Sequence, residues 1–303
     1  MENHERQNHN NINNILIVNV HSSQNSGDLA LLIQTIHYLE ETFGDVTINV
    51  LANWPNELSL EHICHKVIGS PWWLIKVWDK HKKPRYQALS FMLGNLFLLL
   101  FRIDIFSISK RVIPETWFTL FKEYKDTDLV VAVSGNQLFS SGRLGWPLPV
   151  ICMPIYLGLF FHKKILIFPQ SVGPFNTRFE KIIVKFLYNH VSKLYIRDFE
   201  SLKLIHTLKI KKSQPEYMHD LAFTFPPTSE SKARRILKRV GFNGARNNIG
   251  FTIISTMPSY LSPETMISSA SATVTISTKP NHHSNFEIFL FCQVYGPTKD
   301  END

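Results

Sequence analysis

Two short β-branched segments near the start of the chain enclose an amphipathic segment, and this arrangement constrains the fold most. Residues 14–20 (NILIVNV) and 46–51 (VTINVL) consist largely of Val, Ile and Leu, as expected for strands buried on both faces. Between them, apolar residues recur at helical spacing over residues 28–43, and this segment opens with Asp28, an acid suited to a helix N-terminus. A strand, a helix and a strand in this order predict a βαβ unit and therefore a parallel sheet.

The alternation continues to about residue 225. Strand and helix patterns follow one another at residues 128–133, 149–161, 164–168, 178–190, 194–196 and 198–208. In the helix predicted at 178–190, Ile182, Ile183, Phe186 and Leu187 are expected on one face. Residues 52–125 have no comparable order and are expected to be mainly helical. The pattern is typical of a doubly wound α/β domain.

The pattern breaks at Pro226 and Pro227, after which a charged segment at 229–239 predicts a connecting helix. Strand patterns at 248–255 and 286–291 indicate a second domain of the same type. The predicted domains are a disordered polar tail at 1–13, a Rossmann-like domain at 14–226, a connector at 227–246 and a partial second Rossmann-like domain at 247–303.

The charge and the cysteines limit the class of function. A net charge of +7 suits anionic small molecules, an anionic membrane face or nucleic acid. Basic residues cluster at 80–85, 211–212 and 232–239, but no aromatic RNA-binding pattern accompanies them, so we expect no nucleic-acid partner. The 3 cysteines are far apart, which predicts no metal site and fits a reducing cytoplasmic setting.

The longest apolar run covers residues 91–101 and is shorter than the roughly 20 residues that span a bilayer. The N-terminus lacks the apolar core of a signal peptide. We favour burial of this run. Tryptophans at 72, 73 and 78 beside the basic residues 80–85 leave open a peripheral contact with the inner face of the membrane.

Several polar loops follow the predicted strands, where open α/β sheets bind ligands. The loop residues that we single out are Asn25, Ser26, Gly27 and Asp28, then Ser134, Gly135 and Asn136, and finally Gln170, Ser171 and Gly173. Small residues allow a ligand to approach the backbone, and N–H groups at a helix N-terminus attract anions. Each loop taken alone is equally typical of an ordinary turn.

Two charged residues extend this series. Arg197 follows the strand predicted at 194–196, and Asp220 follows at the end of the predicted domain. A guanidinium group binds phosphate or carboxylate through paired hydrogen bonds, but it also forms structural ion pairs with neighbouring acids. The sequence leaves both roles open for Arg197.

The order of these loops resembles that of the polysaccharide pyruvyl transferase family. NSGDLAL resembles the family's N-x-G-D-x-A opening, SGNQLFSSG its small-residue loop, and PQSVGPF its Q-S-I-G-P segment. YIRDFESLKLI is similar to its R-D/E-x-x-S helix start, and HDLAF to its D-x-A-F segment. Residues 291–303 resemble a Q-x-x-G-P-x-x-x-D-D stretch in the family's second domain.

This resemblance implies a GT-B-like fold of two Rossmann-like domains, without metal or cofactor. The implied reaction moves a pyruvyl group from phosphoenolpyruvate to a hydroxyl pair of a saccharide or lipid-linked glycan, forming a pyruvate ketal in cell-surface or exopolysaccharide biosynthesis. Within it, Arg197 is the candidate anion clamp, and Asp28 and Asp220 are candidate catalytic groups that orient hydroxyls. The polar loop residues named above would bind substrate.

The sequence also departs from the family pattern. Ser134 and Asn136 stand where glycines are common, and the chain ends at Asp303, before the family's R-x-H motif with its candidate general acid. We therefore expect a truncated member with reduced or absent activity and poor stability. Two alternatives stay open: a GT-B glycosyltransferase that uses a nucleotide sugar, and a non-catalytic binding protein of polysaccharide assembly.

Overall fold

The computed structural model describes residues 12–21, 25–57, 63–78, 92–99, 113–140, 148–239, 241–242, 247–252 and 286–291. The chain divides into two compact units, Met1–Ser23 with Gly27–Thr224, and Gln24–Ser26 with Phe225–Asp303. The predicted tail at 1–13 lies outside the described residues except for its last two, and the basic segment at 80–85 lies wholly outside them.

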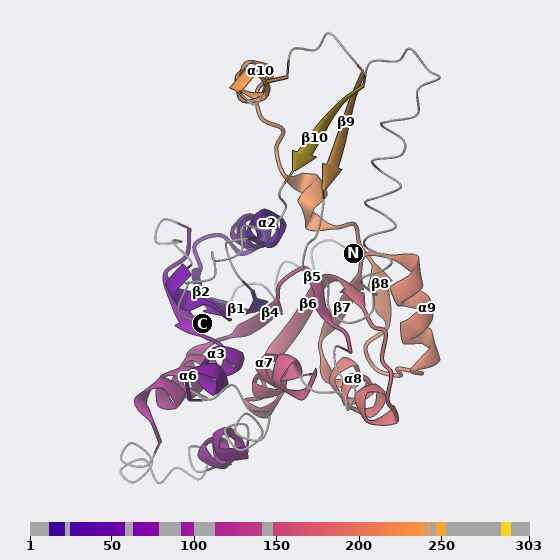
Figure 1. Ribbon diagram of the computed structural model, residues 1–303. Coiled ribbons are helices and arrows are strands. Elements are labelled where there is room, and N and C mark those ends of the chain that lie inside the picture. Colours follow the sequence, from indigo (N-terminus) through magenta and orange to yellow (C-terminus); the bar gives the residue numbers. More distant parts are fainter. Residues whose placement is uncertain are drawn as a thin grey trace. The chain divides into compact units, whose positions relative to one another are not determined.

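The larger unit contains a parallel sheet (Figure 1). Its strands are β1 (Asn14–Val20), β2 (Thr47–Ala52), β3 (Lys66–Gly69), β4 (Leu129–Ala132), β5 (Gly135–Leu138), β6 (Lys164–Val172), β7 (Lys193–Ile196) and β8 (Pro215–Tyr217). Their order is β3-β2-β1-β4-β6-β7-β8, and β5 pairs with β6 beyond the end of β4. The predicted α/β fold class with a parallel sheet is confirmed. The pairing of two such domains in a GT-B-like arrangement stays a prediction.

Helices cover both faces of this sheet. They are α2 (Ser26–Phe43), α3 (Pro71–Trp78), α6 (Glu115–Asp126), α7 (Leu148–Phe160), α8 (Arg178–His190) and α9 (Phe199–Thr207), with short 3-10 helices η2 (Pro55–Glu57) and η3 (Leu221–Thr224). The connection through α2 runs toward β2, whereas those through α7, α8 and α9 run toward β8. Right-handed crossovers that run in opposite directions place their helices on opposite faces of the sheet. Helix α2 therefore packs on one face, and α7, α8 and α9 pack on the other.

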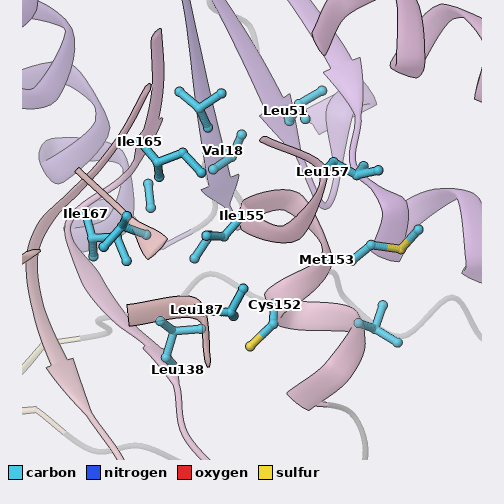
Figure 2. Close-up of a cluster of buried hydrophobic side chains, with 14 of the residues drawn as sticks. Val18, Leu51, Leu138, Cys152, Met153, Ile155, Leu157, Ile165, Ile167 and Leu187 are labelled. Carbon is cyan, nitrogen blue, oxygen red and sulfur yellow. The ribbon is translucent and has the colours of Figure 1, made fainter. Parts of the chain in front are cut away.

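The larger buried cluster lies between the sheet and α7 (Figure 2). Val18, Ile165 and Ile167 come from the strands, and Ile155 and Leu157 come from α7; all of them are fully buried. A helix that is apolar on nearly all sides, as α7 is, belongs in the interior. This packing fixes the strands whose carboxyl ends carry the polar loops.

The helix predicted at 178–190 forms as α8, but its predicted apolar face is only partly buried. Leu187 is buried and Ile183 is partly buried, but Ile182 is 66% exposed and Phe186 is 50% exposed. The residues that face the core are instead Val184, Leu187 and Tyr188, one and two turns beyond Glu180. Because α8 has apolar residues on two sides, periodicity alone does not select the side that packs.

Several element boundaries also differ from those predicted. β3, β5 and β8 were not predicted, and β6 continues through Pro169 to Val172, where the sequence indicated a turn. β6 lies inside the sheet, between β4 and β7, so pairing with β5 and β7 extends its strand conformation over Gln170 and Ser171. Two predicted binding residues therefore lie in the strand itself.

The smaller unit contains α10 (Glu230–Arg239), β9 (Asn247–Thr252) and β10 (Phe286–Phe291). β9 and β10 pair in parallel, from Asn247↔Phe286 to Thr252↔Phe291. The helix and both strands coincide with segments predicted from sequence. The second Rossmann-like domain and the proposed domain boundaries stay predictions.

The apolar run at 91–101 is helical over residues 92–99. Phe97 and Leu98 are buried as expected, whereas Leu96 and Leu99 are about half exposed. In the described part of the chain, no helix has the length and apolar character that crossing a membrane requires.

Candidate anion site at the carboxyl edge of the sheet

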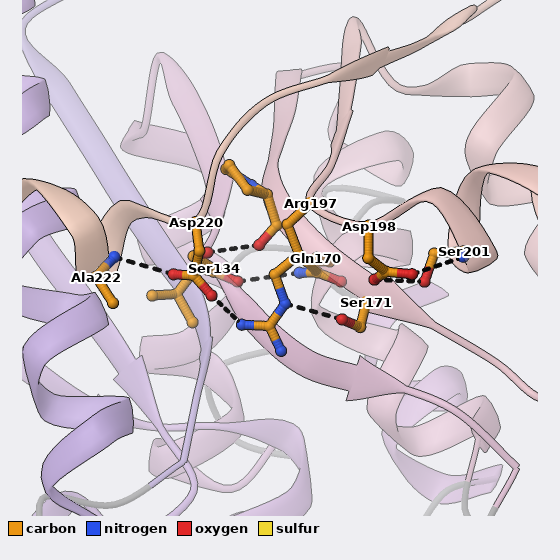
Figure 3. A network of polar contacts seen from close by, with 10 residues as sticks. Ser134, Gln170, Ser171, Arg197, Asp198, Ser201, Asp220 and Ala222 are labelled. Carbon is orange, nitrogen blue, oxygen red and sulfur yellow. Dashed lines mark hydrogen bonds and ion pairs between the residues drawn. The ribbon is translucent and has the colours of Figure 1, made fainter.

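Polar side chains gather where β6, β7 and β8 end (Figure 3). Gln170 and Ser171 lie near the C-terminal end of β6, Arg197 directly follows β7, and Asp220 lies shortly after β8. Because all three strands are parallel, their carboxyl ends share one edge of the sheet. Ligands of open α/β sheets bind at this edge.

Arg197 is the centre of this group. Its Nη1 forms an ion pair with Asp220 Oδ2, and its Nε donates a hydrogen bond to Ser171 Oγ at 2.8 Å. The Arg197 and Asp220 side chains are only 22% and 18% exposed. Figure 3 shows no bond from the second terminal nitrogen of Arg197 to the residues drawn. The described contacts thus fix the guanidinium on two sides, which is a structural role, and the binding role of Arg197 stays a prediction.

Asp220 is itself held in place. Its Oδ1 accepts a hydrogen bond from the backbone N–H of Ala222 at 2.9 Å, at the start of η3. With one oxygen bound to the backbone and the other to Arg197, the carboxylate is oriented toward the guanidinium. In this conformation Asp220 positions Arg197.

Gln170 contributes a buried acceptor. Its side chain is fully buried, and Nε2 donates to the Val133 carbonyl at 3.0 Å. Its Oε1 has no hydrogen-bond partner among the described residues. An unsatisfied buried acceptor costs about 1–3 kcal/mol, so a donor group at this position would be favoured. Nearby, Ser134 Oγ donates to the Pro169 carbonyl, which joins the end of β4 to β6.

A supporting layer fixes the backbone beside Ser171. Asp198 caps the N-terminus of α9 by accepting from the Ser201 N–H at 2.7 Å. The Ser201 hydroxyl accepts in turn from the Val172 N–H at 2.9 Å. Burial acts to raise the pKa of Asp198, but hydrogen bonds from Ser171 and Ser201 outweigh it and lower the pKa. The charged Asp198 therefore anchors both α9 and the end of β6.

Asp28 lies in the first turn of α2, close enough to Arg197 and His21 for electrostatic interaction with both. Burial raises the pKa of this carboxyl, and the positive charges of His21 and Arg197 only partly oppose the shift. The structure thus places a second carboxyl near the guanidinium, in a setting that disfavours its charged form.

Asp28→Asn is expected to stabilise the protein at pH 7 and to gain little at low pH. A carboxyl whose folded pKa is raised destabilises the fold when ionised, and this penalty disappears as pH falls through the raised pKa toward 3.8. Urea unfolding of both proteins between pH 7 and pH 3 measures the difference. A gain independent of pH would show that the charge of Asp28 is not the cause.

The remaining predicted residues have other surroundings. Asn25 precedes α2, and Ser26 and Gly27 form its first residues. Gly135 opens β5 and lies opposite Gln170 in the register, and Asn136 follows in the same strand. Gly173 has a φ of +77° and packs against Leu204 of α9, so its observed contacts are structural.

Sequence reasoning did not single out His21 or Ser201 as parts of this group. His21 directly follows β1, so the rule that strand ends carry site residues would have included it. Ser201 is the serine of the R-D-x-x-S pattern, in which an acid three residues earlier is a helix-capping signal.

The fold and this edge define a parallel α/β protein with a candidate anion site beyond its strands. The chain belongs to the polysaccharide pyruvyl transferase family, whose model matches residues 25–270. The match covers every site residue that was predicted from the sequence.

Two solved structures are similar at low sequence identity. The HepE protein of Anabaena, solved in complex with UDP-glucose, has a TM-score of 0.48 at 10% identity over 92% of this chain and 68% of that one. A Listeria monocytogenes protein described as a candidate UDP-N-acetylglucosamine 2-epimerase has a TM-score of 0.43 at 8% identity over 92% and 69%. The search of curated proteins found no match.

Proposed function

We propose that this protein transfers a pyruvyl group from phosphoenolpyruvate to a hydroxyl pair of a saccharide or lipid-linked glycan, in the cytoplasm. Family membership supports the reaction class. The observation that carries the proposal within the site is Arg197, fixed by Ser171 and Asp220, with no further side-chain contact of its guanidinium among the described residues. Phosphoenolpyruvate carries a carboxylate and a phosphate, and either one matches a guanidinium group.

The chemistry balances without a metal or a redox cofactor. A proton adds to the terminal carbon of the enol, and one saccharide hydroxyl attacks the adjacent carbon. The second hydroxyl then attacks the same carbon, and the bond between that carbon and the phosphate oxygen breaks. The two hydroxyl protons are accounted for by the new methyl group and the departing phosphate, and the product is a pyruvate ketal.

In this proposal each residue has a limited task. Arg197 holds the carboxylate or phosphate and stabilises the charge that grows on the leaving group. The unpaired Oε1 of Gln170 accepts a hydrogen bond from a hydroxyl. Asp28, with its raised pKa, accepts or returns a proton more readily near neutral pH than an ordinary aspartate does.

Phosphoenolpyruvate is expected to raise the melting temperature of the protein, because a ligand that binds only the folded state stabilises it. Phosphate release, followed by phosphorus NMR with a panel of saccharide acceptors, then tests transfer. UDP-glucose in parallel wells tests the nucleotide-sugar alternative. A shift with UDP-glucose and none with phosphoenolpyruvate would overturn the proposal.

A further inference from the structure

The outer side of α8 carries an apolar stripe that no described element of the fold buries. Phe179, Ile182 and Phe186 are 58%, 66% and 50% exposed, and their spacing places them on one side of the helix. The opposite side of α8 already packs into the core through Val184 and Leu187. The stripe therefore has no role in holding α8 on the sheet, and exposed apolar patches of this kind mark interaction sites.

Basic side chains border this stripe. Lys181 and Lys185 of α8 are exposed, as are Lys211 and Lys212 in the loop that follows α9. Across α7, α8 and residues 208–214 the sequence has one carboxylate, Glu180, which is buried in the capping box at the start of α8. The surface therefore combines apolar groups and positive charge without exposed acids on these segments.

Asn189 fixes the two parts of this surface together. Its Oδ1 accepts hydrogen bonds from the backbone N–H groups of Lys211 at 2.8 Å and Lys212 at 3.2 Å. Its Nδ2 donates to the Lys185 carbonyl at 2.8 Å. The loop is thus tied to the last turns of α8, and a shallow hollow forms there, lined by Ile182, Lys185, Phe186, Asn189, His190, Lys211 and Lys212.

Ordinary structural roles explain only part of this arrangement. Cations near a helix C-terminus interact favourably with the helix dipole, which accounts for lysines beside the end of α8. The dipole does not account for Phe179 or Ile182, which lie earlier on the helix and face solvent. No ion pair of Lys185, Lys211 or Lys212 occurs among the described residues.

We propose that this α8 outer face, formed by Phe179, Ile182, Phe186, Lys181, Lys185, Lys211 and Lys212, docks on an anionic phospholipid surface. Apolar side chains on a helix lying parallel to a membrane enter the boundary between headgroups and acyl chains, while lysines contact the phosphates. A nucleic acid would match the lysines but not the aliphatic Ile182. The proposal is independent of the reaction proposed above.

Co-sedimentation with vesicles tests this docking. The purified protein is expected to bind vesicles of equal parts phosphatidylglycerol and phosphatidylcholine, and to bind phosphatidylcholine alone much less. Reversing Lys185, Lys211 and Lys212 to Glu is expected to lower the partition coefficient by about 100-fold, since each basic residue near an anionic surface contributes about fivefold. These side chains are exposed, so the variant should melt at the wild-type temperature.

A matched control lies on α10, where Arg235, Lys238 and Arg239 are also exposed. Reversing these three to Glu changes the net charge by the same amount, and this variant is expected to keep binding. Equal loss in both triple variants would show that net charge alone drives association and would overturn the proposal.

The apolar stripe is tested separately. Phe179→Ser with Phe186→Ser is expected to lower vesicle binding by about tenfold at high salt, where charge attraction is screened. No change in this variant, or binding to a single-stranded oligonucleotide but to no vesicle, would also overturn the proposal.

Discussion

Replacing Arg197 with methionine is expected to weaken phosphoenolpyruvate binding by about 100-fold and to reduce phosphate release at least as much. A hydrogen bond to a charged group contributes about 1.5–3 kcal/mol, and methionine removes the bond without leaving a large void. Arg197→Lys keeps the charge but loses the guanidinium group that contacts both Ser171 and Asp220. We therefore expect this variant to lose less affinity than Arg197→Met. Calorimetric titration and phosphorus NMR measure the two effects.

Loss of the ion pair must be separated from loss of ligand binding. Arg197→Met leaves the Asp220 carboxylate partly buried without its partner, whereas Arg197→Met with Asp220→Asn removes that charge as well. The double variant should recover stability but not binding. Lys193→Met is the matched control, since it removes an exposed ion pair with Glu216 from the opposite end of β7. Wild-type affinity in the double variant would contradict the assigned role of Arg197.

Gly173→Ala is expected to destabilise the protein by about 3 kcal/mol. The φ of +77° disfavours any residue with a Cβ, at about 1–2 kcal/mol. The added Cβ would also lie 2.1 Å from Leu204 Cδ2, and overpacking of a filled site typically costs about 1–3 kcal/mol. Urea unfolding at fixed pH measures the change.

A control for backbone strain alone is Gly44→Ala at the end of α2. Gly44 has a φ of +80°, but a Cβ there would meet nothing within 4 Å, so we expect a loss of only about 1 kcal/mol. A double-mutant cycle of Gly173→Ala with Leu204→Ala isolates the steric part, because the smaller side chain relieves the clash. Equal losses at Gly173 and Gly44 would show that Leu204 is not the obstacle.

The strands at the centre of the fold were predictable because burial on both faces leaves a clear sequence pattern. Residues 14–20 and 129–132 are nearly continuous runs of β-branched and apolar residues, and they form β1 and β4. β8 has only the sequence PEY at an edge, and β5 reads GNQL, so neither carries such a pattern. Their strand conformation comes from pairing with neighbours distant in the sequence, which a local pattern does not contain.

The position of the candidate residues in the fold was more predictable than their contacts. The rule that ligands bind at strand ends selected Gln170, Ser171, Arg197 and Asp220, which the structure places at one edge. Which of them pair was not predictable, since Arg197 lies 26 residues from Ser171 and 23 from Asp220. Gly173 was selected from sequence as a ligand-binding loop residue, and in the structure it packs against Leu204.

Asp220, the acid that pairs with Arg197 in the candidate site, follows the shortest edge strand of the sheet. Asp220 follows β8, which has 3 residues and pairs on one side with β7. Short edge strands open locally at a lower free energy than the sheet centre, and such an opening would carry Asp220 away from Arg197. The guanidinium would then change from a neutralised pair to a net positive charge while β6 and β7 still held it in place. The stability of this edge would thus set how strongly the candidate site attracts anions.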